Sequence, residues 1–256
     1  MRNRSLARRA VLSQIERFAL ERAKLVLLVS GEMGRHYEKK YGVDLSSKSY
    51  VMPCFNTGLR DDAFADEGKY RALRFTYVGS LAPWQCFDET LQLYKEIEGM
   101  VKGASLTIFT FEKDEAAARA RALGVERFEV RTLPPDQLGD ALKGMSYGFM
   151  IRDDVAVNRV ATPTKLSSYL SCGVIPIFSE CLTDFAKATR GLSCACPVSG
   201  LDCASEVVDY VLAGKDVDQI EEECRLLFSG YYSESHHRER LAALIADLLP
   251  VGKRVR

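Results

Sequence analysis

Residues 147–178 decide the fold, and they read YGFMIRDDVAVNRVATPTKLSSYLSCGVIPIF. Two short apolar runs, 147–151 and 174–178, have the length and composition of buried strands. Between them, residues 163–172 are typical of a helix. Strands that are apolar throughout and separated by a helix indicate a parallel sheet whose two faces are both covered.

The same alternation extends from this stretch towards the N-terminus. Strands are expected at 74–80, 105–111 and 127–133, and helices at 86–101, 113–123 and 134–143. Further upstream we expect a strand at 25–29, a helix that Ser30 caps and Gly42 ends, and a short strand at 49–53. The predicted fold class is therefore α/β, with a Rossmann-like parallel sheet and helices on both faces.

The two ends of the chain are predicted to be helical. Near the N-terminus, Val11, Ile15 and Phe18 lie on one face of a basic helix. A helix packed on the domain and a helix on an anionic membrane surface both fit; we favour packing, because three apolar anchors insert weakly. Towards the C-terminus, helices are expected at 205–213 and 217–248, the second one broken near residues 230–232. The tail at 253–256 is predicted to be disordered.

Composition narrows the function classes. The chain has 256 residues, 47% of them hydrophobic, which suffices for one large domain or two small ones. Lys+Arg and Asp+Glu both number 35, so the chain lacks the basic excess of a nucleic-acid-binding protein. The eight cysteines are scattered, which favours buried, reduced thiols in a cytoplasmic protein. We expect neither a secretory signal nor a membrane-spanning segment.

Two loops at the expected carboxyl ends of strands are candidates for a ligand site, because open parallel sheets bind ligands there. The first begins at Gly79, where a missing side chain allows close approach; an ordinary strand-to-helix turn fits equally well. The second runs from Arg152 to Lys165. In it, Thr162 is expected to cap a helix that starts at Pro163, and the free N–H groups of a helix N-terminus favour phosphate binding. Lys165 then lies in the first turn, and a role opposite an anion and a solvated lysine are about equally plausible.

Other chemistry finds little support in the sequence. There is no Gly-rich dinucleotide motif, no Walker motif and no nucleophile elbow. His236 and His237 are adjacent and point to different faces of a helix, so they form a poor metal pair. Cys194 and Cys196 lack partners at zinc spacing, and a small buried pair is the better interpretation.

Three segments resemble retaining glycosyltransferases of the GT-B type, family 4. Residues 162–180, TPTKLSSYLSCGVIPIFSE, resemble the donor-binding helix and the strand after it. Residues 75–91 resemble the first strand and loop of the same C-terminal domain, and residues 25–57 resemble the crossing from the N-terminal domain. The resemblance implies an enzyme without a catalytic metal that transfers a sugar from a nucleotide diphosphate sugar to a glycan or lipid-linked acceptor in cell-surface polysaccharide synthesis.

The sequence departs from the family pattern at positions that hold the donor. Ser80 and Gln85 stand where an arginine and a lysine commonly bind the diphosphate. Ser168 stands where a glutamate binds the ribose, and Val160 at the partner acidic position. Only the end of an N-terminal domain is recognisable, so the resemblance implies a missing domain or a partner chain.

The resemblance divides the chain into an N-terminal remnant at 1–50, a donor-binding domain at 51–215, and C-terminal helices and tail at 216–256. The expected donor site consists of three groups of residues. Phosphate binding is assigned to Gly79, Ser80, Arg152, Thr162, Pro163, Thr164 and Lys165. Nucleoside binding is assigned to Thr132, Leu133, Pro134, Leu166 and Ser168. Trp84, Gln85 and Asn158 complete the donor loops.

Two other functions remain open. A non-catalytic nucleotide-sugar-binding subunit of a split glycosyltransferase fits the missing functions at positions 80, 85 and 168. An epimerase of the same fold fits less well, because no acid and base pair is evident. The protein is expected in the cytoplasm, with peripheral membrane contact or homodimer formation as further possibilities.

Overall fold

The computed structural model describes residues 2–200 and 202–248, and the side chains from residue 7 onward within them. The tail at 253–256, for which disorder is predicted, lies outside these residues. The chain forms two compact units: residues 1–53 with 233–256, called unit 1, and residues 54–232, called unit 2.

Unit 2 contains a six-stranded parallel sheet in the order β5-β4-β3-β6-β7-β8. The strands are β3 (Arg74–Val78), β4 (Ser105–Phe109), β5 (Phe128–Arg131), β6 (Tyr147–Met150), β7 (Ile175–Ser179) and β8 (Cys196–Val198). The α/β fold class predicted from the alternating pattern is thus confirmed. The strand order reverses between β3 and β6, so this sheet has a switch point at its centre.

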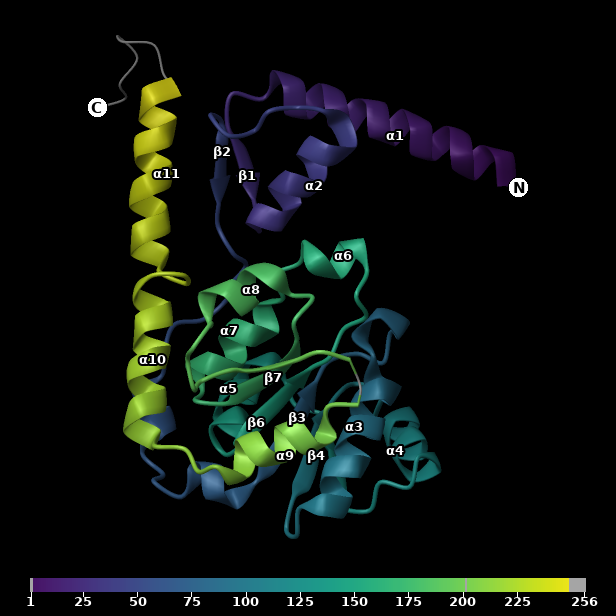
Figure 1. Ribbon diagram of the computed structural model, residues 1–256, viewed down its shortest axis with the longest axis vertical. Helices are drawn as coiled ribbons and strands as arrows, with labels where there is room; N and C mark the ends of the chain where they lie inside the picture. The colour runs from purple at the N-terminus through teal and green to yellow at the C-terminus, as the bar shows by residue number, and fades with distance from the viewer. Residues whose placement is uncertain (1, 201, 249–256) are drawn as a thin grey trace. The chain divides into compact units, whose positions relative to one another are not determined.

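Helices cover both faces of the sheet (Figure 1). The helices are α3 (Phe87–Met100), α4 (Lys113–Ala122), α5 (Pro135–Lys143), α6 (Ala156–Arg159), α7 (Thr164–Ser171), α8 (Thr183–Ala188), α9 (Ala204–Leu212) and α10 (Val217–Ser229). The short 3-10 helices are η1 (Asp61–Phe64), η2 (Lys69–Ala72) and η3 (Pro83–Gln85). Helices α3, α4 and α9 share one face, whereas α5 and α7 enclose a second cluster on the other.

The main core lies between the sheet and α3. Phe75 of β3 stacks on Tyr147 and Phe149 of β6 and meets Tyr94 of α3 edge-on. These side chains are almost fully buried. Aromatic rings bury large areas and fix their neighbours through preferred ring geometries. This packing fixes β3 and β6 against each other and against α3.

Unit 1 is built on a two-stranded parallel sheet. It contains α1 (Arg2–Arg22), β1 (Val26–Leu28), α2 (Gly31–Tyr41), β2 (Ser49–Val51) and α11 (Glu234–Leu248). Ser30 accepts a hydrogen bond from the Met33 backbone N–H at 3.0 Å, and Gly42 ends α2, as the sequence predicts. His237 of α11 bonds through Nδ1 to the Tyr50 hydroxyl of β2 at 2.6 Å.

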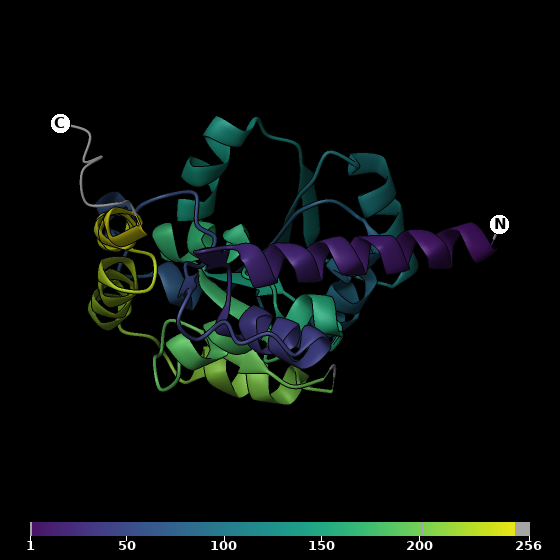
Figure 2. The same ribbon diagram turned by 90° about the horizontal axis from the view of Figure 1, so that it is seen from above.

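The packed face of α1 is not the expected one. Val11, Ile15 and Phe18 are 58%, 59% and 61% exposed. The helix instead contacts α2 through Ser13, whose hydroxyl lies 3.0 Å from that of Tyr41, and it buries Leu20 on the same side. Figure 2 shows that the N-terminal half of α1 extends past α2. None of the described helices combines the length and apolar character needed to cross a membrane.

Candidate functional site

Two cations meet at the switch point of the unit 2 sheet. Arg152 follows β6, and Lys165 lies in the first turn of α7. Arg152 donates from Nη2 to the Gln85 side-chain oxygen at 2.7 Å, and Lys165 donates from Nζ to that same oxygen at 2.8 Å. Within the part of the chain that the structure describes, neither cation forms an ion pair with a carboxylate. The shared partner is a neutral carboxamide, so the positive charge of the pair is not neutralised.

Burial makes this charge costly. Burial, and after it the neighbouring Arg152 charge, lower the pKa of Lys165 to about 8. Burial also lowers the pKa of Arg152. Both shifts indicate that the protein environment disfavours the two positive charges when the site is empty. A bound anion would offset that cost, which makes the pair a candidate anion site.

The absence of a side chain at Gly79 leaves room for the Lys165 ammonium. A Cβ atom at position 79 would lie 2.3 Å from Nζ of Lys165. The backbone there has φ +152°, which glycine adopts and side-chain-bearing residues rarely do. The expected close approach at Gly79 is therefore to the side chain of Lys165.

An apolar cavity adjoins the cation pair on the side of β4 and β5. It has a volume of about 300 Å³. Its lining includes Gly79, the residue beside the Lys165 ammonium. Phe109, Phe111, Leu133 and Leu138 supply apolar walls. A flat, largely apolar group with a polar edge suits such a cavity. Of these walls only Leu133 is predicted from the sequence; Phe109, Phe111 and Leu138 are not, although the aromatic end of the strand at 105–111 is a visible signal.

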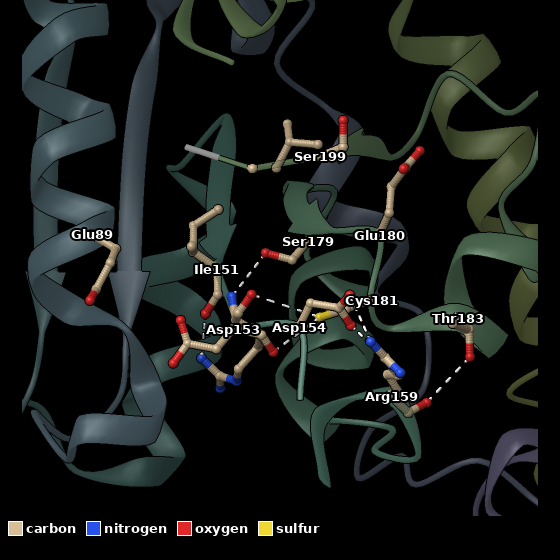
Figure 3. A pocket seen from close by; sticks show the side chains of 13 residues that line it. Glu89, Ile151, Asp153, Asp154, Arg159, Ser179, Glu180, Cys181, Thr183 and Ser199 are labelled. Carbon is tan, nitrogen blue, oxygen red and sulfur yellow. Dashed lines mark hydrogen bonds and ion pairs between the residues drawn. The ribbon is translucent and has the colours of Figure 1, made fainter. Parts of the chain in front are cut away.

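A second cavity lies at the carboxyl ends of β6, β7 and β8 (Figure 3). It has a volume of about 450 Å³, and acidic and hydroxyl groups line much of it. The Arg152 backbone N–H donates to the Ser179 hydroxyl at 2.9 Å, and Arg159 pairs with Asp154 at 2.5 Å. Burial raises the pKa of the Cys181 thiol to about 11, so this cysteine is protonated at neutral pH. The described lining of this cavity therefore contains no reactive thiolate. Its carboxylates and hydroxyls can form hydrogen bonds with hydroxyl groups of a ligand.

The structure corrects the expected start of α7. The helix begins at Thr164, and Pro163 occupies the cap position without a side-chain hydrogen bond. The Thr162 hydroxyl oxygen instead accepts from the Cys54 backbone N–H at 3.0 Å. Thr162 therefore does not cap the helix, because its side chain is used to hold the segment after residue 53.

The other predicted site residues separate into two groups. Ser80 and Leu133 line the apolar cavity, and the Thr132 hydroxyl donates to the Thr110 carbonyl at 2.7 Å beside it. Pro135, not Pro134, lines that cavity.

Several predicted residues line neither cavity. Leu166 is 1% exposed in the core, and the Asn158 amide donates to the Asp153 carbonyl at 2.8 Å. The Ser168 hydroxyl bonds to the Asn56 side-chain oxygen at 3.1 Å. Trp84 is 64% exposed and has no role in either cavity wall.

The cysteines and histidines show no metal site. None of the eight cysteines forms a disulfide, and Cys194 and Cys196 are both buried. The described residues contain no cluster of three or more side chains suited to a metal ion. His237 is engaged by Tyr50, as described above.

Comparison with known proteins finds similarity in structure only. No protein-family model and no curated protein matches the sequence. Among solved structures, a TarM variant from S. aureus in complex with fondaparinux, alpha-GlcNAc-glycerol and UDP has 10% identity and a TM-score of 0.66. The match includes 90% of this chain and 46% of the TarM chain. A glycosyltransferase from Rickettsia africae has 12% identity and a TM-score of 0.69, with 96% of this chain covering 68% of it.

A third structure, the GtfA/B complex, has 12% identity and a TM-score of 0.65, with 90% of this chain covering 47% of the matched chain. This chain therefore spans between about half and two thirds of the length of these three structures. It has the fold of these glycosyltransferases over nearly all of its own length.

Proposed function

We propose that unit 2 binds the nucleotide diphosphate sugar that serves as the donor in a glycosyl transfer. The observation that carries the proposal is the cation pair of Arg152 and Lys165, which shares one neutral acceptor and no carboxylate. The diphosphate would lie on this pair, and the base would enter the adjoining apolar cavity. The presence of UDP in the TarM complex supports the choice of ligand class.

The chemistry follows from where charge develops. In the transfer, the bond between the anomeric carbon and the diphosphate oxygen breaks, and its electron pair leaves with the diphosphate. The acceptor hydroxyl oxygen bonds to the anomeric carbon and gives up its proton; the family resemblance implies that the leaving phosphate takes it. Two fixed cations beside the leaving group stabilise the added negative charge without needing to reorganise. Arg152 and Lys165 would supply this stabilisation.

The acceptor is proposed by class only. The resemblance in residues 162–180 suggests a glycan or a lipid-linked acceptor and a role in polysaccharide synthesis. This chain spans only 46–68% of its structural neighbours, so the acceptor site belongs to a further domain or a partner chain in this proposal. The related alternative is a subunit that binds the donor and leaves catalysis to its partner. Sugar transfer by the pure chain would exclude the partner requirement.

Nucleotide binding tests the donor site directly. We expect UDP to bind more tightly than UMP in calorimetry at pH 7. Lys165→Met should weaken UDP binding by about tenfold or more, because a charge-assisted hydrogen bond is lost. The matched control is Lys102→Met, which removes an exposed lysine from the same unit and should leave UDP affinity unchanged.

Thermal unfolding of both variants separates lost binding from lost folding. Lys165→Met should be at least as stable as the wild type, since it removes a half-buried charge next to Arg152. Absence of binding by the wild type to any nucleoside diphosphate at millimolar concentration would refute the donor site. Equal UDP affinity of the two lysine variants would remove Lys165 from it.

A further inference from the structure

Gln85 occupies an unusual position between the two cations. Its side-chain oxygen accepts from both of them, and its backbone carbonyl accepts a further hydrogen bond from Nη1 of Arg152 at 3.1 Å. Gln85 therefore contacts Arg152 through two of its atoms and Lys165 through one. Without this shared acceptor, the two like charges would repel each other and separate.

The local backbone holds Gln85 in place. It ends the 3-10 turn η3, where its backbone N–H donates to the Ala82 carbonyl at 2.8 Å. The next residue, Cys86, has φ +50°, a left-handed conformation that costs energy for a side-chain-bearing residue. Cys86 is buried and is the N-cap residue of α3, so the residue that follows Gln85 is anchored in the core.

We propose that Gln85 is a neutral clamp, an uncharged side chain that positions Arg152 and Lys165 in the empty site. When a diphosphate binds, both cations bond to it instead of to Gln85. Gln85 thereby determines the ligand charge that the site selects. This inference rests on the proposed donor function and deepens it. Gln85 is a positioning residue, because it acts through the two cations.

The neutrality of the clamp is its essential property. A carboxylate at position 85 would hold the cations at least as strongly but would neutralise one of the two positive charges. A carboxamide holds them and leaves the full charge for the ligand. Lys165 makes one described hydrogen bond from an ammonium with three donors, so donors remain for phosphate oxygens. The site should therefore prefer a diphosphate over a monophosphate.

The protonation of Lys165 gives the clamp a signature that depends on pH. The titratable or charged groups facing its ammonium are Tyr77 on β3, whose ring centre is 5.7 Å away, and Arg152 after β6. Burial raises the pKa of Tyr77, so this phenol stays neutral through the range of interest. The pKa of Lys165 is about 8, so the empty site loses this charge as the pH rises above 8. UDP affinity should fall over the same range.

Three variants test the clamp. Gln85→Glu should weaken UDP binding by about tenfold or more, and UMP binding less, because one positive charge is cancelled. It should also raise the pKa of Lys165, so that UDP affinity begins to fall at a higher pH than in the wild type. Gln85→Ala should weaken UDP binding without shifting the pH dependence upward. The matched control is Gln92→Glu on the exposed side of α3, which should change neither quantity.

Two measurements distinguish a failure of the proposed clamp from a failure of the proposed donor function. Calorimetry with UDP and UMP between pH 7 and pH 10 reports the selection of the ligand. An NMR titration of the ¹³C-dimethylated lysines reports the pKa of Lys165 in the ligand-free protein. If the wild type binds UDP but Gln85→Glu matches Gln92→Glu in affinity and in the Lys165 pKa, the clamp is refuted and the donor site stands. If the wild type binds neither nucleotide, the donor function fails, and the selection assigned to Gln85 fails with it.

Discussion

Lys69 is a charged side chain that the fold has buried completely. It is 0% exposed, and its ammonium donates to three backbone carbonyls, those of Ala63, Lys143 and Cys172, at 3.1, 2.8 and 2.7 Å. These hydrogen bonds join η2 to the ends of α5 and α7. Burial lowers the pKa of Lys69 to about 8 from an ordinary value of 10.5. The ammonium thus donates to three backbone carbonyls, at a cost in desolvation.

The shift makes stability depend on pH in a defined direction. Between pH 8 and 10.5, the unfolded chain binds a proton at Lys69 that the folded protein has released. The contribution of Lys69 to the free energy of unfolding therefore rises with pH over this range, by up to about 3 kcal/mol. We expect the wild type to gain stability relative to Lys69→Met between pH 8 and 10.5 in urea denaturation. A stability difference that stays constant with pH would mean that Lys69 titrates normally.

At the scale of elements, the packing of α7 against β6 depends on one glycine, Gly148. A Cβ atom at Gly148 would lie 2.7 Å from the ring of Tyr169, so β6 and α7 approach closely only because this side chain is absent. Tyr169 is fully buried and belongs to the cluster that α5 and α7 enclose. Since α7 also carries Lys165, the same contact determines where the ammonium lies relative to the switch point.

Gly148→Ala should therefore affect stability and binding together. We expect a loss of about 1–3 kcal/mol in the free energy of unfolding, because overpacking displaces the buried ring. UDP affinity should also fall, since α7 would move with its lysine. Gly99→Ala in α3 is the matched control: nothing lies within 4 Å of its added Cβ, and it should stabilise the helix by up to about 1 kcal/mol. Chemical denaturation and calorimetry measure both effects, and unchanged affinity in Gly148→Ala would separate the helix position from the site.

At the scale of the molecule, the candidate site belongs to one unit. Both cations, Gln85, Gly79 and the lining of both cavities lie within residues 54–232. The largest buried cluster lies within the same residues. Unit 1 has a separate small core around Leu20, Leu28, Val43 and Leu45. Each unit thus has its own apolar cluster, which is the physical requirement for independent folding.

Residues 54–232 produced alone should consequently fold and bind UDP. We expect a cooperative thermal transition, and a UDP affinity within a few-fold of that of the full chain. The physical reason is that the described hydrogen bonds of the cation pair are made to residues of unit 2. A fragment that folds but binds UDP much more weakly would show that unit 1 contributes to donor binding.

The order of the elements followed from local patterns in the sequence. Apolar runs flanked by helical segments located the strands at the centre of the sheet, such as those around Thr76 and Phe149, because a strand buried on both faces needs an apolar residue at nearly every position. Ser30 and Gly42 located the ends of α2, because capping depends on neighbours only three or four residues away. Arg152 and Lys165 were recognisable as candidates, because each follows or starts an element with a clear signal.

What surrounds these residues was decided only by the tertiary structure. Gln85 is 67 residues from Arg152 and 80 from Lys165 in the sequence, and no local pattern indicates that one oxygen serves both. The exposed face of α1 and the use of Thr162 by Cys54 likewise depend on which segments pack together. Propensity and periodicity act over one or two turns, whereas the meeting of two charges is determined by the packing of a whole sheet. The unneutralised cation pair is therefore a property of the fold, although its members are visible in the sequence.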